Sequence, residues 1–199
     1  MFHGSSSGLG SSAAWSMEGE NAGDAFGYRV AAAGDVNGDG YDDILIGAYG
    51  ADPGGITGAG ETYVVFGKGD SFHATVDLSG LDGTNGFVLQ GIDAYDRSGF
   101  SVSTAGDVNG DGYSDILIGA YLADPGGVSG EGETYVVFGK ESDFHASVLL
   151  SSLEDSDGVI LEGGEAGDNS GFSVSTAGDV NGDGYADILI GAKNADPGG

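Results

Sequence analysis

The sequence predicts an all-β protein made of repeated four-stranded antiparallel sheets. A nine-residue acidic tract occurs three times at a spacing of 72 residues, at 35–43, 107–115 and 179–187. Residues 98–127 and 170–199 are identical at 27 of 30 aligned positions. Most of the 42 glycines recur in register between short apolar runs, where they act as turn residues, and no helical stripe is sustained. A fixed period of this length indicates a repeat architecture.

Each repeat contains four runs that are typical of strands. In the second repeat, we expect strands at Gly99–Ser103, Asp115–Ala120, Glu133–Gly139 and Gly158–Gly163. The second and third runs are apolar without alternation, which indicates sheets that are covered on both faces. A unit of this size, with four strands and two buried faces, is one blade of a β-propeller, in which blades stack around a central axis.

The repeat divides the chain into about 2.75 blades. We expect the tail of a preceding blade at 1–25 with its fourth strand around 15–19, a blade at 26–97 with the tract 35–43, a blade at 98–169 with the tract 107–115, and the first half of a blade at 170–199 with the tract 179–187. A propeller needs about four blades, so we expect an incomplete ring. Other blades of a longer chain, or further copies of the chain itself, would complete it. Because bare blade faces expose apolar patches, we expect the isolated chain to self-associate.

Each acidic tract offers oxygen ligands at alternate positions. The expected ligands are side chains at the first, third, fifth and ninth positions and the backbone carbonyl at the seventh: Asp35, Asn37, Asp39, Tyr41 and Asp43; Asp107, Asn109, Asp111, Tyr113 and Asp115; and Asp179, Asn181, Asp183, Tyr185 and Asp187. Hard oxygen ligands of this kind suit Ca²⁺. Glycine at the sixth position permits the sharp turn. The sequence therefore predicts about three calcium ions, one per loop.

Two other interpretations of the tracts remain open. In the first, they are tight turns that bind no ion, although like charges crowded into one turn repel each other. In the second, they belong to a dockerin-like or EF-hand module, which needs an acidic twelfth residue and a following helix. The twelfth residues here are Ile46, Ile118 and Ile190, all inside apolar runs.

Composition excludes several classes of function. Five Lys and Arg against 32 Asp and Glu give a net charge of −27, so nucleic acid is not an expected partner. No apolar run is long enough to span a membrane, no signal peptide is visible, and there is no Cys. The three histidines, His3, His73 and His145, repeat in register and are interpreted as structural. We expect no catalytic residues, no organic cofactor and no enzyme activity, because no motif for such chemistry is present.

The repeats resemble FG-GAP repeats, the blades of the integrin α-subunit propeller and of its bacterial relatives. Phe26-Gly27 matches the Phe-Gly near the blade start, and the later copies read Ser-Gly-Phe at 98–100 and 170–172. Gly47-Ala48 begins the Gly-Ala-Pro element, but Tyr49 replaces the proline. The resemblance covers nearly the whole chain, and the acidic tracts match the calcium loop of the family at every ligand position.

The resemblance implies a calcium-binding module for extracellular or cell-surface adhesion, or for recognition of a protein or glycan ligand. It does not name the ligand, because recognition would lie in the loops between strands. The alternative is a non-catalytic propeller within a larger secreted hydrolase. Extracellular calcium modules bind at about 10⁻⁴–10⁻³ M, which favours the same location.

Overall fold

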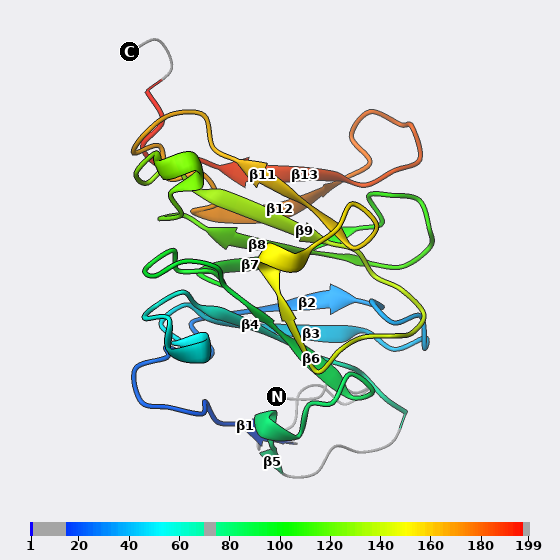
Figure 1. Ribbon diagram of the computed structural model, residues 1–199. Coiled ribbons are helices and arrows are strands. Elements are labelled where there is room, and N and C mark those ends of the chain that lie inside the picture. The colour runs from blue at the N-terminus through cyan, green and yellow to red at the C-terminus, as the bar shows by residue number, and fades with distance from the viewer. Residues whose placement is uncertain (2–14, 70–74, 197–199) are drawn as a thin grey trace.

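The computed structural model describes residues 1, 15–69 and 75–196, and all its main elements are strands. The chain forms part of a β-propeller, with sheets stacked one on the next (Figure 1). In chain order, the strands are β1 (Ser16–Met17), β2 (Arg29–Gly34), β3 (Asp43–Ala48), β4 (Glu61–Val65), β5 (Thr75–Val76), β6 (Gly86–Gln90), β7 (Ser101–Gly106), β8 (Asp115–Ala120), β9 (Glu133–Val137), β10 (Ser147–Leu149), β11 (Gly158–Glu162), β12 (Ser173–Gly178) and β13 (Asp187–Gly191). Four 3-10 turns, η1 to η4, occupy Pro53–Gly55, Leu78–Gly80, Pro125–Gly127 and Leu150–Ser152.

The antiparallel sheets follow the order of the repeat. Strands β2, β3, β4 and β6 form one sheet, β7, β8, β9 and β11 the next, and β12 pairs with β13. The pairing register repeats with the sequence: Val30 lies opposite Ile46 in the first sheet, and Val102 lies opposite Ile118 in the second. The prediction of an all-β fold with four-stranded antiparallel sheets is therefore confirmed.

A short parallel pairing ties each sheet to the following repeat. Strand β10 pairs with β6, and β5 pairs with β1 in the equivalent register, so that Val88 faces Ser147 as Ser16 faces Thr75. Strand β1 thus holds the place of a fourth strand relative to β5. Strands β5 and β10 were not predicted, because the contacts that define these two- and three-residue strands come from the neighbouring sheet.

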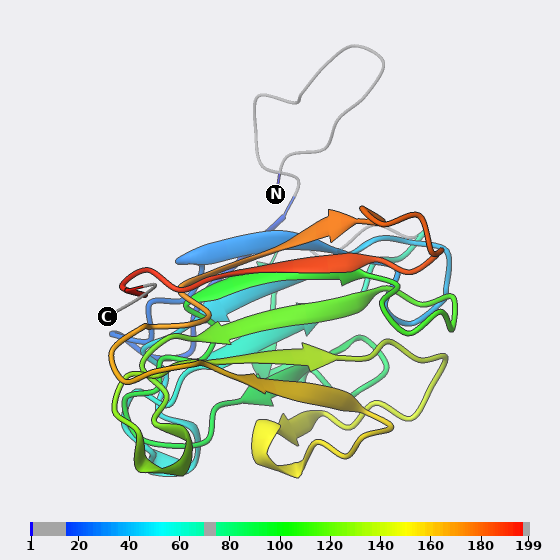
Figure 2. The same ribbon diagram turned by 90° about the horizontal axis from the view of Figure 1, so that it is seen from above.

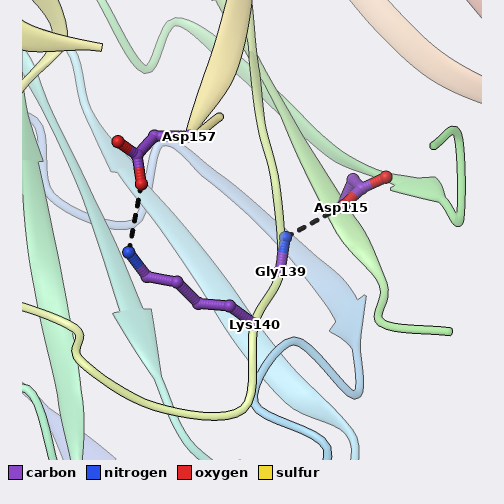
Figure 3. Close-up of polar contacts among 4 residues, drawn as sticks. All are labelled: Asp115, Gly139, Lys140 and Asp157. Atoms are coloured by element: carbon purple, nitrogen blue, oxygen red, sulfur yellow. Dashed lines mark hydrogen bonds and ion pairs between the residues drawn. The ribbon is translucent and has the colours of Figure 1, made fainter. Parts of the chain in front are cut away.

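Four strand boundaries of the second sheet differ from the prediction. The first strand ends at Gly106 rather than Ser103, and the fourth ends at Glu162 rather than Gly163. The first strand of the second sheet begins at Ser101 rather than Gly99, because Gly99 lies in a turn at φ +80. The third strand ends at Val137 rather than Gly139, because the amide of Gly139 donates to the Asp115 carboxylate instead of to a sheet partner (Figure 3). The histidine predictions for His3 and His73 lie outside the described residues.

The core lies between the sheets. Ile116, Leu117 and Ile118, which are consecutive in β8, are each 0% exposed, so both faces of this strand are covered as predicted. One buried cluster joins the first sheet to the second, and another joins the second sheet to β12 and β13. Figure 2 shows from above how the strands of successive sheets lie over one another. Among the described residues, no helix has the length and apolar character needed to cross a membrane.

Candidate metal centres

The three acidic tracts lie in equivalent hairpin loops. They connect β2 to β3, β7 to β8 and β12 to β13, so each lies between the first and second strands of its repeat. Each loop follows a β-bulge at a glycine with positive φ, namely Gly34 at +78, Gly106 at +79 and Gly178 at +68. The bulge turns the chain out of the ladder. A strand, not a helix, follows every tract, which is evidence against the EF-hand interpretation.

Backbone amides and side-chain oxygens hold the first loop together. The carboxylate of Asp35 accepts from the N–H of Asp39 at 3.0 Å and from the N–H of Gly40 at 2.9 Å. The amide side chain of Asn37 donates to Asp39 Oδ2 at 3.0 Å, and Asp39 Oδ1 accepts from the N–H of Tyr41 at 2.9 Å. The first, third and fifth side chains therefore lie side by side and share one network.

The other two loops repeat this network. Asp107 accepts from the amides of Asp111 and Gly112, at 3.1 and 3.0 Å. In the third loop, Asp179 accepts from Asp183 and Gly184, at 3.1 and 2.9 Å. A carboxylate has about four acceptor sites, so these bonds leave oxygen lone pairs for a cation. The sequence repeat is thus a repeat of local geometry.

In the first two tracts, the ninth residue anchors the loop to the sheet. Asp43 is 1% exposed, and its two oxygens accept from the amides of Val36 and Gly67, both at 2.8 Å. Asp115 is 0% exposed and accepts from Val108 at 2.8 Å and from Gly139 at 2.9 Å, the latter shown in Figure 3. Each of these carboxylates joins the start of its tract to the end of the third strand of its sheet.

The environment of these two buried carboxylates, Asp43 and Asp115, disfavours their ionised forms. Burial raises the pKa of Asp43 to about 6, the charges of Asp39 and Asp35 add to the rise, and the amide hydrogen bonds oppose it. Burial likewise raises the pKa of Asp115 to about 6. A nearby cation would favour the ionised form of both groups.

The structure does not by itself assemble an ion cage. Within residues 1, 15–69 and 75–196, no group of three or more Asp, Glu or His side chains is arranged to hold a metal. The carboxylates instead accept hydrogen bonds from loop amides. The chemistry of the tracts still fits Ca²⁺, because each supplies three carboxylates and an amide oxygen within nine residues. A cation would also offset the burial and the neighbouring negative charges that raise the pKa of Asp43 and of Asp115.

Sequence reasoning missed the contacts that link one loop to the next. The amide of Ser114 donates to the carbonyl of Asp35 at 2.9 Å, and the amide of Ala186 donates to that of Asp107 at 2.9 Å. The ring of Tyr113 covers Gly38 so closely that a methyl group on that glycine would lie 2.4 Å from the ring. A tyrosine at the seventh position was predicted only as a carbonyl ligand, and its ring proves to be a contact between repeats.

A second acidic region lies at the opposite ends of the strands. The hydroxyl of Tyr63 donates to Glu61 at 2.7 Å, and Tyr135 makes the equivalent bond to Glu133. Asp96 is 5% exposed, and burial raises its pKa to about 6. The two glutamates belong to different sheets and are each engaged by a tyrosine of the same strand, as expected for structural groups.

The fold is that of a β-propeller in which every repeat carries an equivalent loop between its first two strands. The FG-GAP repeat model matches residues 26–65, 98–137 and 170–199, more than half of the chain. The chain therefore belongs to the FG-GAP repeat family, and the sequence resemblance is confirmed.

Curated relatives agree with this assignment. The chain is 32% identical over 190 residues to integrin alpha-5 of Xenopus laevis, covering 92% of this chain and 16% of that protein. It is 31% identical over 191 residues to integrin alpha-PS2 of Drosophila melanogaster, covering 92% and 12%. A third relative is the phosphatidylinositol-glycan-specific phospholipase D of Bos taurus, at 32% over 165 residues, covering 83% and 18%. The chain thus spans less than a fifth of the length of these relatives.

Proposed function

We propose that this chain is a calcium-stabilised propeller module for extracellular or cell-surface adhesion, or for recognition of a protein or glycan ligand. The observation that carries the proposal is the same hydrogen-bonded acidic network in three loops at one spacing. The relatives named integrin alpha support the adhesion class, since the chain matches them over about nine-tenths of its length. We assign it no catalytic residue.

The proposed division into blades follows the repeat. We assign 1–25 to the end of a preceding blade, 26–97 and 98–169 to two blades, and 170–199 to the first half of another. Other blades of a longer chain, or further copies of this one, would complete the ring.

Calcium would be held by the residues of the three tracts. The proposed ligands are Asp35, Asn37, Asp39, the carbonyl of Tyr41 and Asp43 in the first loop, with the equivalent residues at 107–115 and 179–187 in the others. The ion would supply positive charge where three carboxylates of one loop repel. The chain's own part is to preorganise the oxygens, through amide bonds to the first and fifth residues and through the pinned ninth residue.

Thermal unfolding with and without calcium tests this function. We expect millimolar Ca²⁺ to raise Tm and EDTA to lower it, because an ion that binds only the folded state stabilises it by mass action. Replacing Asp39, Asp111 and Asp183 together by Ala should abolish the calcium dependence. A matched triple variant at Asp52, Asp124 and Asp155, outside the tracts, should retain it. A wild-type Tm that is the same in Ca²⁺ and EDTA would contradict the proposal.

A second candidate function is a propeller within a larger secreted hydrolase. The match to the phosphatidylinositol-glycan-specific phospholipase D favours it, because such repeats occur in a protein whose name denotes an enzyme. In that case the catalytic residues would lie outside these 199 residues. The neighbouring gene sequence distinguishes the two candidates: a hydrolase domain in the same reading frame supports the second.

A further inference from the structure

The chain buries two interfaces between successive repeats, and both use equivalent apolar residues. Leu45 and Val102 belong to one buried cluster between the first and second sheets. Leu117 and Val174, each 72 residues further along, belong to the cluster between the second sheet and β12–β13. A leucine from the second strand of one repeat thus packs with a valine from the first strand of the next.

The polar contacts across these interfaces repeat as well. The eighth residue of each following tract donates its amide to the carbonyl of the first residue of the preceding tract, in the Ser114–Asp35 and Ala186–Asp107 pairs. The seventh-position ring covers the fourth-position glycine of the preceding tract. For Tyr185 and Gly110, a methyl group on the glycine would lie 2.4 Å from the ring, as it does for Tyr113 and Gly38.

At each end of the stack of sheets, one side of such an interface is exposed among the described residues. The front face, on β2, β3 and the loop between them, exposes Val30 to 67% and Tyr41 to 47%. The back face, on β12, β13 and the loop between them, exposes Leu189 to 59% and Val180 to 72%. Figure 1 places these two faces toward opposite ends of the stacked sheets.

The same residue types are buried where the chain covers its own repeats. Val102, the counterpart of Val30, is 8% exposed, and Leu117, the counterpart of Leu189, is 0% exposed. Val36, the counterpart of Val180, is 1% exposed. The exposure therefore reflects position at an end of the stack and not a change in sequence.

The front face is also hollowed. An apolar groove of about 820 Å³ lies against β2 and β3, with Met17, Phe26, Ile44 and Ile46 among its lining residues. Strand β1 borders the groove and holds the place of a fourth strand. The groove therefore lies where the first strands of a preceding blade would stand, next to β1.

We propose that the back face of one copy of this chain docks on the front face of a second copy, head to tail. Leu189 then meets Val30, the ring of Tyr41 covers Gly182, and the amide of Asp42 donates to the carbonyl of Asp179. A methyl group on Gly182 would meet nothing within 4 Å in the single chain, so the place of the ring is open. A second copy fits because its front face presents Val30 and Tyr41 at the positions that Val102 and Tyr113 hold in the chain's own first interface.

The side chain of Asp42 opposes this contact. Asp42 occupies the eighth position of its tract, where the buried interfaces have Ser114 and Ala186. Those two side chains lie against Gly34 and Gly106, and Gly178 is the corresponding glycine of the back face. A carboxylate confined there without a partner weakens association. The structure therefore assigns Asp42 as the residue that limits the affinity between copies.

The test is sedimentation equilibrium of four single variants, each alone and in mixtures. Val30→Asp blocks the front face and Leu189→Asp blocks the back face, and both change side chains that are already exposed, so folding is retained. Val128→Asp is the matched control, because Val128 is 39% exposed in the loop after η3 and lies outside both faces. Circular dichroism verifies that all variants are folded. Runs in Ca²⁺ and in EDTA separate this result from calcium binding.

A head-to-tail interface makes a specific pattern. The wild type and Val128→Asp should associate, while Val30→Asp and Leu189→Asp alone should each associate on the order of tenfold or more weakly, because a charge is buried. Mixed one to one, these two variants should form a complex of two chains, since each retains one intact face. Asp42→Ser should tighten the wild-type Kd.

Three results would overturn the proposal. They are a wild type that stays monomeric at its highest soluble concentration, a mixture of the two blocked variants that does not associate, and a Val30→Asp variant that dimerises as well as the wild type. The last result would show that the front face takes no part in the association. An unchanged Kd for Asp42→Ser would also contradict the docked position of that residue.

Discussion

The first and third acidic loops have nearly the same sequence, yet their environments differ. Val36 of the first loop is 1% exposed, while Val180 of the third is 72% exposed. Asp43 is buried and bonded to the end of β4 through Gly67, and the described chain has no third strand beside Asp187. The bond from the sixth-position amide to the first carboxylate is nonetheless present in both. Loop conformation is therefore local to nine residues, whereas burial comes from the following repeat.

The largest difference is expected at the ninth position of the tract. Asp115→Ala leaves the buried amides of Val108 and Gly139 without acceptors, at a cost of roughly 2–4 kcal/mol in free energy of unfolding. Asp187→Ala should cost under about 1 kcal/mol, because this residue is only half-buried and its bond to Val180 is exposed. Urea unfolding in EDTA measures both. Equal losses would show that coverage does not distinguish the loops.

The fourth-position glycines provide the next comparison. Gly38 has φ +72 and lies beneath the ring of Tyr113, while Gly182 has φ +78 and open space around it. Gly182→Ala should cost about 1 kcal/mol from backbone strain alone. Gly38→Ala should cost about 1–3 kcal/mol more, because the ring must move. Thermal unfolding compares the two variants. A Gly38→Ala loss no larger than that of Gly182→Ala would contradict the described packing between loops.

Calcium affinity should also differ between the first two loops, which the following repeat covers, and the exposed third loop. The first two loops are held by contacts from the following repeat, so binding there costs less ordering than in the third loop. We expect roughly tenfold tighter binding in the covered loops than in the third. Terbium luminescence of the Asp183→Ala variant should lose the weak phase, and that of Asp39→Ala a tight one. One uniform phase in the wild type would contradict this ranking.

A smaller effect is expected from pH. Burial raises the pKa of Asp96 from 3.8 to about 6, with added repulsion from Asp93, Glu133 and Asp124. The stability from this group is fully present below its unfolded pKa and is lost as pH rises through about 6. Metal-free protein should therefore gain stability from pH 7 to pH 5, and Asp96→Asn should reduce that gain.

The matched control for the pH experiment is Asp168→Asn. Asp168 is the counterpart of Asp96 in the next repeat and is only half-buried. Its variant should keep the wild-type pH profile, measured as Tm in EDTA between pH 5 and 7. A flattened profile in Asp168→Asn, with an unchanged one in Asp96→Asn, would reverse the assignment.

Much of the fold could be predicted from the sequence because its signals are local and repeated. The apolar run of β8, the glycine-marked turns and the spacing of 72 residues predict stacked antiparallel sheets, and the structure has them. The short strands β5 and β10 could not be predicted, because their partners are strands of the neighbouring sheet. The calcium ligands remain a prediction, since the loops hold their carboxylates with amide hydrogen bonds.

The contacts between loops could not be predicted from the sequence, for a different reason. Tyr41, Tyr113 and Tyr185 are the same residue at the same tract position. Only the order of the repeats in space shows that two of these rings cover a glycine of the preceding tract and that the first is left without one. Because the repeats have the same residue at this position, no sequence pattern indicates which tyrosine contacts a preceding tract.

Calcium stoichiometry tests the central claim most directly. Isothermal titration calorimetry of the EDTA-treated, dialysed chain should count three ions per chain. Asp39→Ala, Asp111→Ala and Asp183→Ala should each remove one of the three. No heat and no bound calcium at millimolar concentration, with the chain folded by circular dichroism, would contradict the account.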